Sequence, residues 1–290
     1  MSLPAAEFQW VADLIKRESS IIIGAGKEYL VLARLLPLAR EAGEANVGDY
    51  LAKIRKSVDR AAIQAIVDAL TTNETSWFRD QVPFQALTET VLPQLLTARA
   101  SQRHLRIWSA ACSSGQETYS LAITVQEFLP AGWSYEIFAS DISGEMVARA
   151  QTGQYSQIEV NRGLPAKMLV HYFERHGAAW RIAPALRQKV TFQRLNLAAP
   201  PPAVAPFDLV FLRNVLIYFD IPTKQTVLRN IGRLMRPDAW LFLGAAESTI
   251  GIDDSFERAA AGKTFAYQLR KPESAPADRN GVMAGARTNR

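Results

Sequence analysis

The hydrophobic positions of the first 80 residues recur at the spacing of amphipathic helices rather than of strands. This pattern predicts a helical front, followed by a linker helix from Val82 to Arg99. Asp59 is expected to cap the fourth helix, because a carboxylate at that position accepts hydrogen bonds from first-turn N–H groups. The front helices are expected around residues 8–15, 29–40 (with Gly43 as the stop), 49–56, and after Asp59, where Ile63, Ile66, Val67 and Leu70 share one face.

From His104 onward, apolar runs with strand character alternate with helical stretches, which predicts an α/β fold with a parallel sheet. Residues from about 155 to 194 interrupt this alternation and predict a small inserted subdomain. That insert is expected to hold a helix from Pro165 to Arg175 and strands at 180–182 and 189–192. The remaining strands are expected at 105–109, 135–139, 190–197, 207–214 and 240–245, with helices from Gln116, at 145–150 and at 222–235, and a closing hairpin at 256–270.

These patterns divide the chain into four parts. They are a helical domain at 1–81, a linker helix at 82–103, an α/β domain at 104–270 that contains the insert, and a tail at 271–290. The tail is poor in large apolar residues, so we expect it to be disordered.

Charge and composition exclude several classes of protein. The net charge is +5, and the insert holds seven Lys and Arg residues against two Asp and Glu residues. No RNA- or DNA-binding motif accompanies this excess, so we expect no nucleic-acid partner. The sequence shows no membrane-spanning run and no signal peptide, and its one cysteine and three histidines form no metal-ligand pattern. We therefore expect a cytosolic, metal-free protein that does not insert into a membrane.

The clearest chemical signal lies between residues 104 and 141. A strand leads into a loop of small residues, Ala110–Gly115, and the strand after the next helix ends in Asp141. Small residues let a ligand approach the backbone, and the acid can accept hydrogen bonds from ribose hydroxyls. The glycines of the dinucleotide motif are absent, and Glu117 at the start of the helix would repel a phosphate. The stretch favours a cationic nucleoside, S-adenosylmethionine; the alternative is an ordinary βαβ unit without a ligand.

Six segments carry a specific pattern: TTNETSWFRD (71–80), WSAACSSGQETYSLAI (108–123), FASDIS (138–143), RGLPAKMLVHYF (162–173), FDLVFLRNVLIYFD (207–220) and GAAES (244–248). In order and spacing they resemble the CheR family, the bacterial chemoreceptor glutamate methyltransferases that use S-adenosylmethionine. The resemblance covers about residues 7 to 270. It implies a Rossmann-like class I methyltransferase sheet, an N-terminal all-α domain and a small inserted β-subdomain. The implied activity forms glutamyl methyl esters on the cytoplasmic helical bundle of chemoreceptors, with S-adenosylhomocysteine as the other product.

The resemblance also implies site residues. Arg79 and Tyr218 would be catalytic, and the cofactor would be held by Asn73, Thr75, Arg79, Glu117, Asp141, Asn196, Leu197, Arg213 and Asn214. A glutamate acceptor is ionised at neutral pH, so the reaction needs alignment and exclusion of water rather than a general base. One departure from the family pattern is Gln116, because relatives often carry an acid at this position beside the one that matches Glu117.

The residues themselves leave alternatives for these roles. The guanidinium of Arg79 is suited to hold a carboxylate through two hydrogen bonds, but an ion pair with Asp80 is the alternative. Asn73 is alternatively a helix cap, Glu117 a first-turn acid favoured by the helix dipole, and Tyr218 a core aromatic. Trp77 is expected to pack.

The resemblance implies a chemoreceptor cytoplasmic domain as the partner, and we expect a monomer. The turn Arg175–Trp180 is short, so we expect no tether to a receptor's C-terminal pentapeptide. Recognition would instead be direct, through Arg162, Lys167, Arg175 and Arg181. Other functions remain open: methylation of a signalling receptor outside chemotaxis, or a non-catalytic S-adenosylmethionine-binding module. A nicotinamide-dependent oxidoreductase is disfavoured by the missing glycines.

Overall fold

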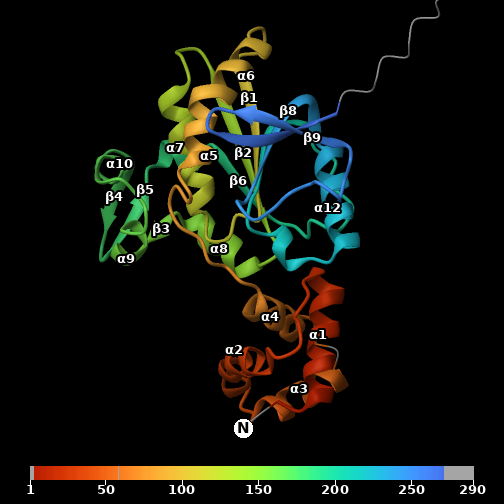
Figure 1. Cartoon of the computed structure of the whole chain (residues 1–290). Coiled ribbons are helices and arrows are strands. Elements are labelled where there is room, and N and C mark those ends of the chain that lie inside the picture. Colours follow the sequence, from red (N-terminus) through yellow and green to blue (C-terminus); the bar gives the residue numbers. More distant parts are fainter. Residues whose placement is uncertain (1–2, 58, 271–290) are drawn as a thin grey trace, which may run out of the picture.

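A computed structural model describes residues 3–57 and 59–270, so the tail expected to be disordered at 271–290 lies outside the described residues. The chain forms a helical front and an α/β body (Figure 1). Asp59 caps the fourth helix as predicted, because its carboxylate accepts the N–H groups of Ala61 and Ala62 at 2.9 and 3.2 Å. The four front helices pack around a core of their own; they are α1 (Ala5–Ser19), α2 (Glu28–Glu41), α3 (Val47–Ser57) and α4 (Arg60–Leu70).

The expected linker helix is not one regular α-helix. It consists of α5 (Val82–Ala86), a π-helical turn η1 (Leu87–Val91) and α6 (Leu92–Ala98). Pro93 gives the physical reason, because it has no N–H for the carbonyl four residues earlier and its ring clashes with that carbonyl in a regular α-helix.

A buried ion-pair cluster fixes the end of this linker to the sheet. Arg99, just after α6, donates from Nε to the Asp208 carboxylate at 2.6 Å. Arg99 also pairs with Asp238 at 2.5 Å, and Arg236 pairs with Asp208 at 3.1 Å. The side chains of Arg99 and Asp208 are 8% and 1% exposed. Neither charge is therefore left without an opposite charge in the interior.

The body is built on a seven-stranded sheet with the order β6-β2-β1-β7-β8-β10-β9. The first five strands in this order run parallel, and β9 and β10 form an antiparallel hairpin at one edge. This confirms the predicted α/β fold and its closing hairpin. The strands are β1 (His104–Ala110), β2 (Ser134–Asp141), β6 (Val190–Arg194), β7 (Phe207–Leu212), β8 (Met235–Leu243), β9 (Phe256–Ala261) and β10 (Thr264–Leu269).

Helices cover both faces of the sheet (Figure 1). On one face, Ile107 and Phe211 pack with α7 (Gln116–Phe128) and the linker. On the other face, Trp108 and Val210 pack with α12 (Ile221–Arg233). Because β1 lies between β2 and β7, the carboxyl ends of three parallel strands meet at one edge, where ligands bind in open α/β sheets.

Some predicted boundaries are wrong. The strand expected at 190–197 ends at Arg194, opposite the last residue of β2, so Asn196 and Leu197 follow the strand. Similarly, β7 ends at Leu212, opposite the last residue of β1. The helix expected at 222–235 ends at Arg233, and β8 starts at Met235 rather than at 240. Pairing with the neighbouring strand, which the sequence pattern does not show, sets these ends.

The insert contains a three-stranded antiparallel sheet with the order β3-β5-β4. The helix expected at 165–175 is too long, because its last residues form β4 and pair with β5. The strand expected in the insert at 189–192 belongs to β6 of the main sheet instead. The elements between β2 and β6 are α8 (Gly144–Thr152), β3 (Gln154–Tyr155), α9 (Gln157–Val160), α10 (Ala166–Tyr172), β4 (Phe173–His176), β5 (Ala179–Ile182) and α11 (Pro184–Arg187).

Candidate functional site

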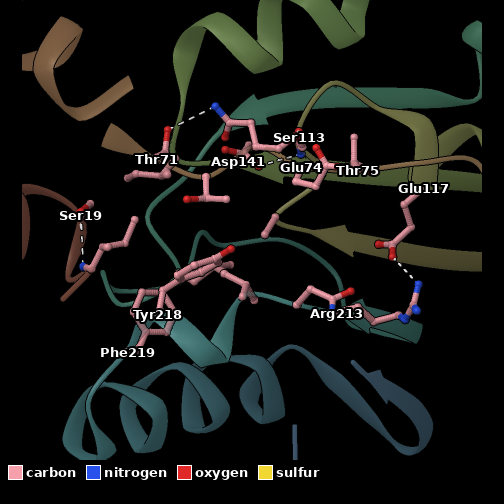
Figure 2. A pocket seen from close by; sticks show the side chains of 18 of the residues that line it. Ser19, Thr71, Glu74, Thr75, Ser113, Glu117, Asp141, Arg213, Tyr218 and Phe219 are labelled. Carbon is pink, nitrogen blue, oxygen red and sulfur yellow. Dashed lines mark hydrogen bonds and ion pairs between the residues drawn. The ribbon is translucent and has the colours of Figure 1, made fainter. Parts of the chain in front are cut away.

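One pocket at the carboxyl edge of the sheet is lined by all ten residues that the resemblance implied. Figure 2 labels Thr75, Glu117, Asp141, Arg213 and Tyr218 among them. It holds about 840 Å³ of empty space, part of which is open to solvent. Its lining comes from the 71–79 segment, the loop after β1, the end of β2, the segment after β6 and the segment after β7. The implied residues are Asn73, Thr75, Arg79, Glu117, Asp141, Asn196, Leu197, Arg213, Asn214 and Tyr218.

The helical front supplies part of the pocket wall, which sequence reasoning missed. Ser19 and Ile21, at and just after the end of α1, line the pocket together with Thr71. The backbone N–H of Ile22 donates to the Tyr218 carbonyl at 2.9 Å, which joins front and body beside the pocket. No sequence motif marks Ser19 or Ile21, because their role depends on contacts with segments far away in the chain.

Asp141 is held rigidly at the end of β2. Its side chain is buried, with one oxygen accepting the Ser113 N–H at 2.7 Å and the other accepting the Ser143 N–H at 3.0 Å. Burial raises the pKa of Asp141, and the backbone N–H donors oppose that rise. The loop of small residues therefore folds around this carboxylate, and Ser113 itself adopts a positive φ of 48°.

Glu117 and Asp80 are joined by Arg213. Arg213 is 1% exposed and donates to the Glu117 carboxylate at 3.0 Å and to the Asp80 carboxylate at 2.6 Å (Figure 2 shows the first pair). Burial raises the pKa of Glu117, while Arg213, Ser109 and Arg79 act in the opposite direction. Glu117 thus faces the pocket as one member of a buried charge network rather than as an isolated acid.

The structure decides between the alternatives left for Arg79 and Asn73. Asp80 pairs with Arg213, and the Arg79 guanidinium donates to the Glu74 carbonyl at 3.2 Å, so the Arg79–Asp80 ion pair is wrong. No helix begins at Asn73, so it is not a helix cap. Its backbone carbonyl instead accepts the Ser113 hydroxyl at 2.8 Å, which ties the 71–79 segment to the loop after β1.

Tyr218 and Trp77 have different environments. Tyr218 is half-buried at the end of the short 3₁₀ helix η2 (Leu216–Tyr218) and lines the pocket, so it is not a core aromatic. Trp77 is 1% exposed and packs edge-on against Tyr155 and Phe173, as its predicted packing role requires.

The residues present fit S-adenosylmethionine. Apolar side chains of Ile21, Ile142 and Leu197 can border a flat base, and Asp141 offers oxygens to a ribose. Arg79 offers a cation to a carboxylate, either that of the cofactor's amino-acid end or that of a glutamate acceptor. Within residues 3–57 and 59–270 no group of three or more His, Cys, Asp or Glu side chains is arranged to hold a metal ion.

Two of the basic residues expected in recognition, Arg175 and Arg181, lie on different faces of the small sheet. Arg175 lies opposite Trp180 on the β4–β5 pair and stacks on its ring at 4.4 Å. Arg181 lies opposite Glu174 and therefore on the other face of the small sheet. Arg162 forms an ion pair with Glu74. Arg175 and Arg181 therefore cannot contact a partner from the same face of the small sheet, and direct recognition through these residues stays a prediction.

The parallel sheet, the loop of small residues after β1 and the acid at the end of β2 define a class I S-adenosylmethionine-dependent methyltransferase. The comparison with protein families identifies the particular group. Residues 6–71 match the all-alpha domain of CheR methyltransferases, and residues 73–265 match their S-adenosylmethionine-binding domain. The chain belongs to the CheR methyltransferase family.

Curated relatives match over almost their whole length. Chemotaxis protein methyltransferase 1 of Pseudomonas aeruginosa is 39% identical over 279 residues, which cover 93% of this chain and 100% of that protein. Chemotaxis protein methyltransferase Cher2 of Pseudomonas putida is 36% identical over 276 residues, with the same coverage. The chemotaxis protein methyltransferase of Escherichia coli is 34% identical over 264 residues, covering 88% of this chain and 89% of that protein. Of the helices that the structure describes, none is long and apolar enough to cross a membrane.

Proposed function

We propose that this protein is a glutamate O-methyltransferase that acts in the cytoplasm and forms methyl esters on the helical bundle of chemoreceptors during chemotaxis adaptation. The observation that carries the proposal is the placement of Arg79 and Tyr218 in the same pocket as Asp141. A pocket that only bound the nucleoside would not need a half-buried guanidinium and a phenol beside it. The names of the curated relatives support the chemotaxis role.

In this proposal the pocket holds the cofactor from two ends. Asp141 accepts hydrogen bonds from the ribose hydroxyls, while Asn196, Leu197 and Asn214 border the adenosine. Asn73 and Thr75 contact the cofactor from the other side of the pocket. Bound S-adenosylmethionine supplies a methyl group activated by its sulfonium charge. Glu117 also lines the pocket, and its carboxylate, which Arg213 holds, stabilises that positive charge.

The protein's own task is to align the acceptor and keep water out. The glutamate acceptor is ionised at neutral pH, so no residue has to remove a proton from it. Arg79 orients this carboxylate, and Tyr218 donates a hydrogen bond within the same pocket. Ser19 and Ile21 of the front close one side of the pocket and limit the access of water. Arg213 acts at this site mainly by holding Glu117 and the Arg79 segment, because its two terminal nitrogens donate to them.

The labelling experiment that tests this function uses the full chain, methyl-labelled S-adenosylmethionine and membranes that contain a chemoreceptor. We expect label on the receptor that is released by base, as a methyl ester requires. The Arg79→Ala variant should leave the receptor unlabelled. Base-labile label on another membrane protein would place the enzyme in a different signalling pathway, and no base-labile label would reject glutamate methylation.

We also propose that the enzyme works as a monomer and recognises the receptor directly, without a C-terminal pentapeptide tether. The β4–β5 turn has only Gly177 and Ala178 between its paired ends, which supports this view. Since Arg175 and Arg181 lie on opposite faces, Arg175→Glu and Arg181→Glu are tested singly for salt-dependent methylation rates. A slower rate in one variant identifies the docking face. Tight binding of a receptor pentapeptide would contradict direct recognition.

A further inference from the structure

The segment that carries Arg79 is a strained turn. Phe78, Asp80 and Gln81 have positive φ values of 47°, 66° and 43°. Residues with a Cβ rarely adopt such conformations, and they persist only where the surrounding structure holds them. The position of Arg79 therefore depends on contacts that the turn makes with other parts of the molecule.

One of these contacts comes from the loop after α9, which holds the RGLP part of the 162–173 segment. The N–H of Trp77 donates to the Arg162 carbonyl at 3.0 Å. Gly163, with a φ of 99°, lies directly against the Trp77 carbonyl. A Cβ at this position would lie less than 3.0 Å from that carbonyl oxygen, closer than real Cβ atoms come to any atom. The obstructing atom is backbone, so a side chain at 163 forces the loop or the turn to move.

Other contacts hold the turn from its remaining sides. The Trp77 ring packs edge-on against Tyr155 and Phe173 of the small sheet, at centroid distances of 4.9 and 5.3 Å. The Phe78 N–H donates to the Ser120 hydroxyl of α7 at 3.0 Å. Arg213 donates to the carbonyl of Arg79 itself at 3.1 Å. Since Arg79 follows Trp77 by only two residues, a displacement at Trp77 strains the contacts that hold Arg79 in this turn.

We propose that Gly163 is a positioning residue for methyl transfer. By allowing the loop after α9 to lie against the Trp77 backbone, it sets the place from which Arg79 reaches the pocket. This inference rests on the proposed function, in which Arg79 aligns the acceptor. None of residues 161–165 lines the pocket, and the nearest atoms that a Cβ at Gly163 would meet all belong to Trp77, so the clash acts on the turn and not on Asp141 or Leu197 at the adenosine end. Substitution at 163 should therefore affect the rate of transfer far more than cofactor affinity.

The test compares Gly163→Ala with Gly132→Ala. Gly132 also has a positive φ, 84°, but a Cβ there would meet only the end of the Arg103 side chain, at 3.8 Å. It precedes β2 at the opposite edge of the sheet from the pocket. Both variants thus carry the backbone penalty of an alanine at positive φ, and only Gly163→Ala adds the clash with the turn.

Three quantities are measured for both variants: kcat for methylation of a purified chemoreceptor cytoplasmic fragment, calorimetric affinity for S-adenosylhomocysteine, and hydrogen–deuterium exchange of the peptide spanning 73–86. A displacement of about 1 Å near reacting groups lowers rates on the order of 100-fold. We expect Gly163→Ala to lower kcat by about 10- to 100-fold, to change affinity less than about threefold, and to speed exchange at Trp77 and Phe78. Gly132→Ala should leave all three near wild type.

Equal kcat losses in the two variants would overturn the proposal, as would a loss of affinity as large as the loss of kcat. If Gly163→Ala does not fold, Trp77→Phe replaces it, because it weakens the packing that holds the turn without a clash. Unchanged kcat in Trp77→Phe would then overturn the proposal. If the wild type methylates no receptor, the proposed function fails. The exchange comparison still decides whether Gly163 holds the turn.

Discussion

Replacement of Asp141 tests the cofactor pocket most directly. The carboxylate is 6% exposed, and each of its oxygens already accepts one backbone N–H, from Ser113 or Ser143. A carboxylate oxygen can accept further bonds, and the proposed function uses this capacity for ribose hydroxyls. A hydrogen bond to a charged group contributes about 1.5–3 kcal/mol, which corresponds to an affinity change of about 10- to 150-fold. We predict a loss of this size in S-adenosylhomocysteine affinity for Asp141→Asn.

Asp141→Ala should lower the free energy of unfolding as well as the affinity for S-adenosylhomocysteine. It leaves the N–H groups of Ser113 and Ser143 without their acceptor, at about 1–3 kcal/mol for each buried donor. The free energy of unfolding should therefore fall for Asp141→Ala, and the loop of small residues should loosen. Asp141→Asn keeps one acceptor oxygen and can hold only one of these two N–H groups. The free energy of unfolding is therefore measured beside affinity for both variants, and affinity lost beyond the change in stability reports the ligand contact.

The assay is isothermal titration calorimetry at one pH and salt concentration. The matched control is Glu145→Gln, which removes an exposed acid on α8, four residues further along, and causes the same change in net charge. Affinity of Asp141→Asn within twofold of wild type would refute the assignment of Asp141 to the ribose. A loss of equal size in Glu145→Gln would show that net charge, not the contact, is responsible.

Arg79→Ala and Tyr218→Phe should lower the methylation rate strongly while the midpoint of thermal unfolding changes little. If the fall in the unfolding midpoint accounts for all of the lost activity, both residues are structural. S-adenosylhomocysteine at 100 times its Kd should add about 2.7 kcal/mol to the free energy of unfolding, and an unmoved midpoint would reject the pocket. Folding raises the pKa of Glu117, so the folded protein favours the protonated side chain. The free energy of unfolding that this proton adds is fully present below the pKa of the unfolded chain and is lost as pH rises through the folded pKa. Urea unfolding across pH should show that Glu117→Gln removes this dependence. Asp208→Asn should lower the free energy of unfolding in urea by less than the about 3–5 kcal/mol of a fully uncompensated buried charge, because Arg99 keeps its ion pair with Asp238, and S-adenosylhomocysteine affinity should be unchanged.

The sequence pattern was sufficient where structure depends on short segments. The loop Ala110–Gly115 and the acid that ends β2 are recognisable because strand, loop and helix follow one another directly. The helical front was predictable for the same reason, since helical periodicity and the Asp59 cap are local. The resemblance to a family supplied the implied site residues, and the structure brings all of them to one pocket.

Features that depend on distant partners were not predictable. Residues 173–176 continue a helical pattern, yet pairing with β5 makes them a strand. The bond between Arg213 and Asp80 joins positions 133 residues apart. Ser19 enters the pocket only because the end of α1 lies against the body. In each case the deciding energy comes from a tertiary contact, which local periodicity does not record.

The shared wall of the pocket has a consequence for how such a chain can evolve. Ser19 and Ile21 line the same space as Asp141 and Tyr218, although they belong to the helical front. A gene rearrangement that exchanged the front for another helical module would remove one side of the cofactor site. The two halves therefore have to be inherited together.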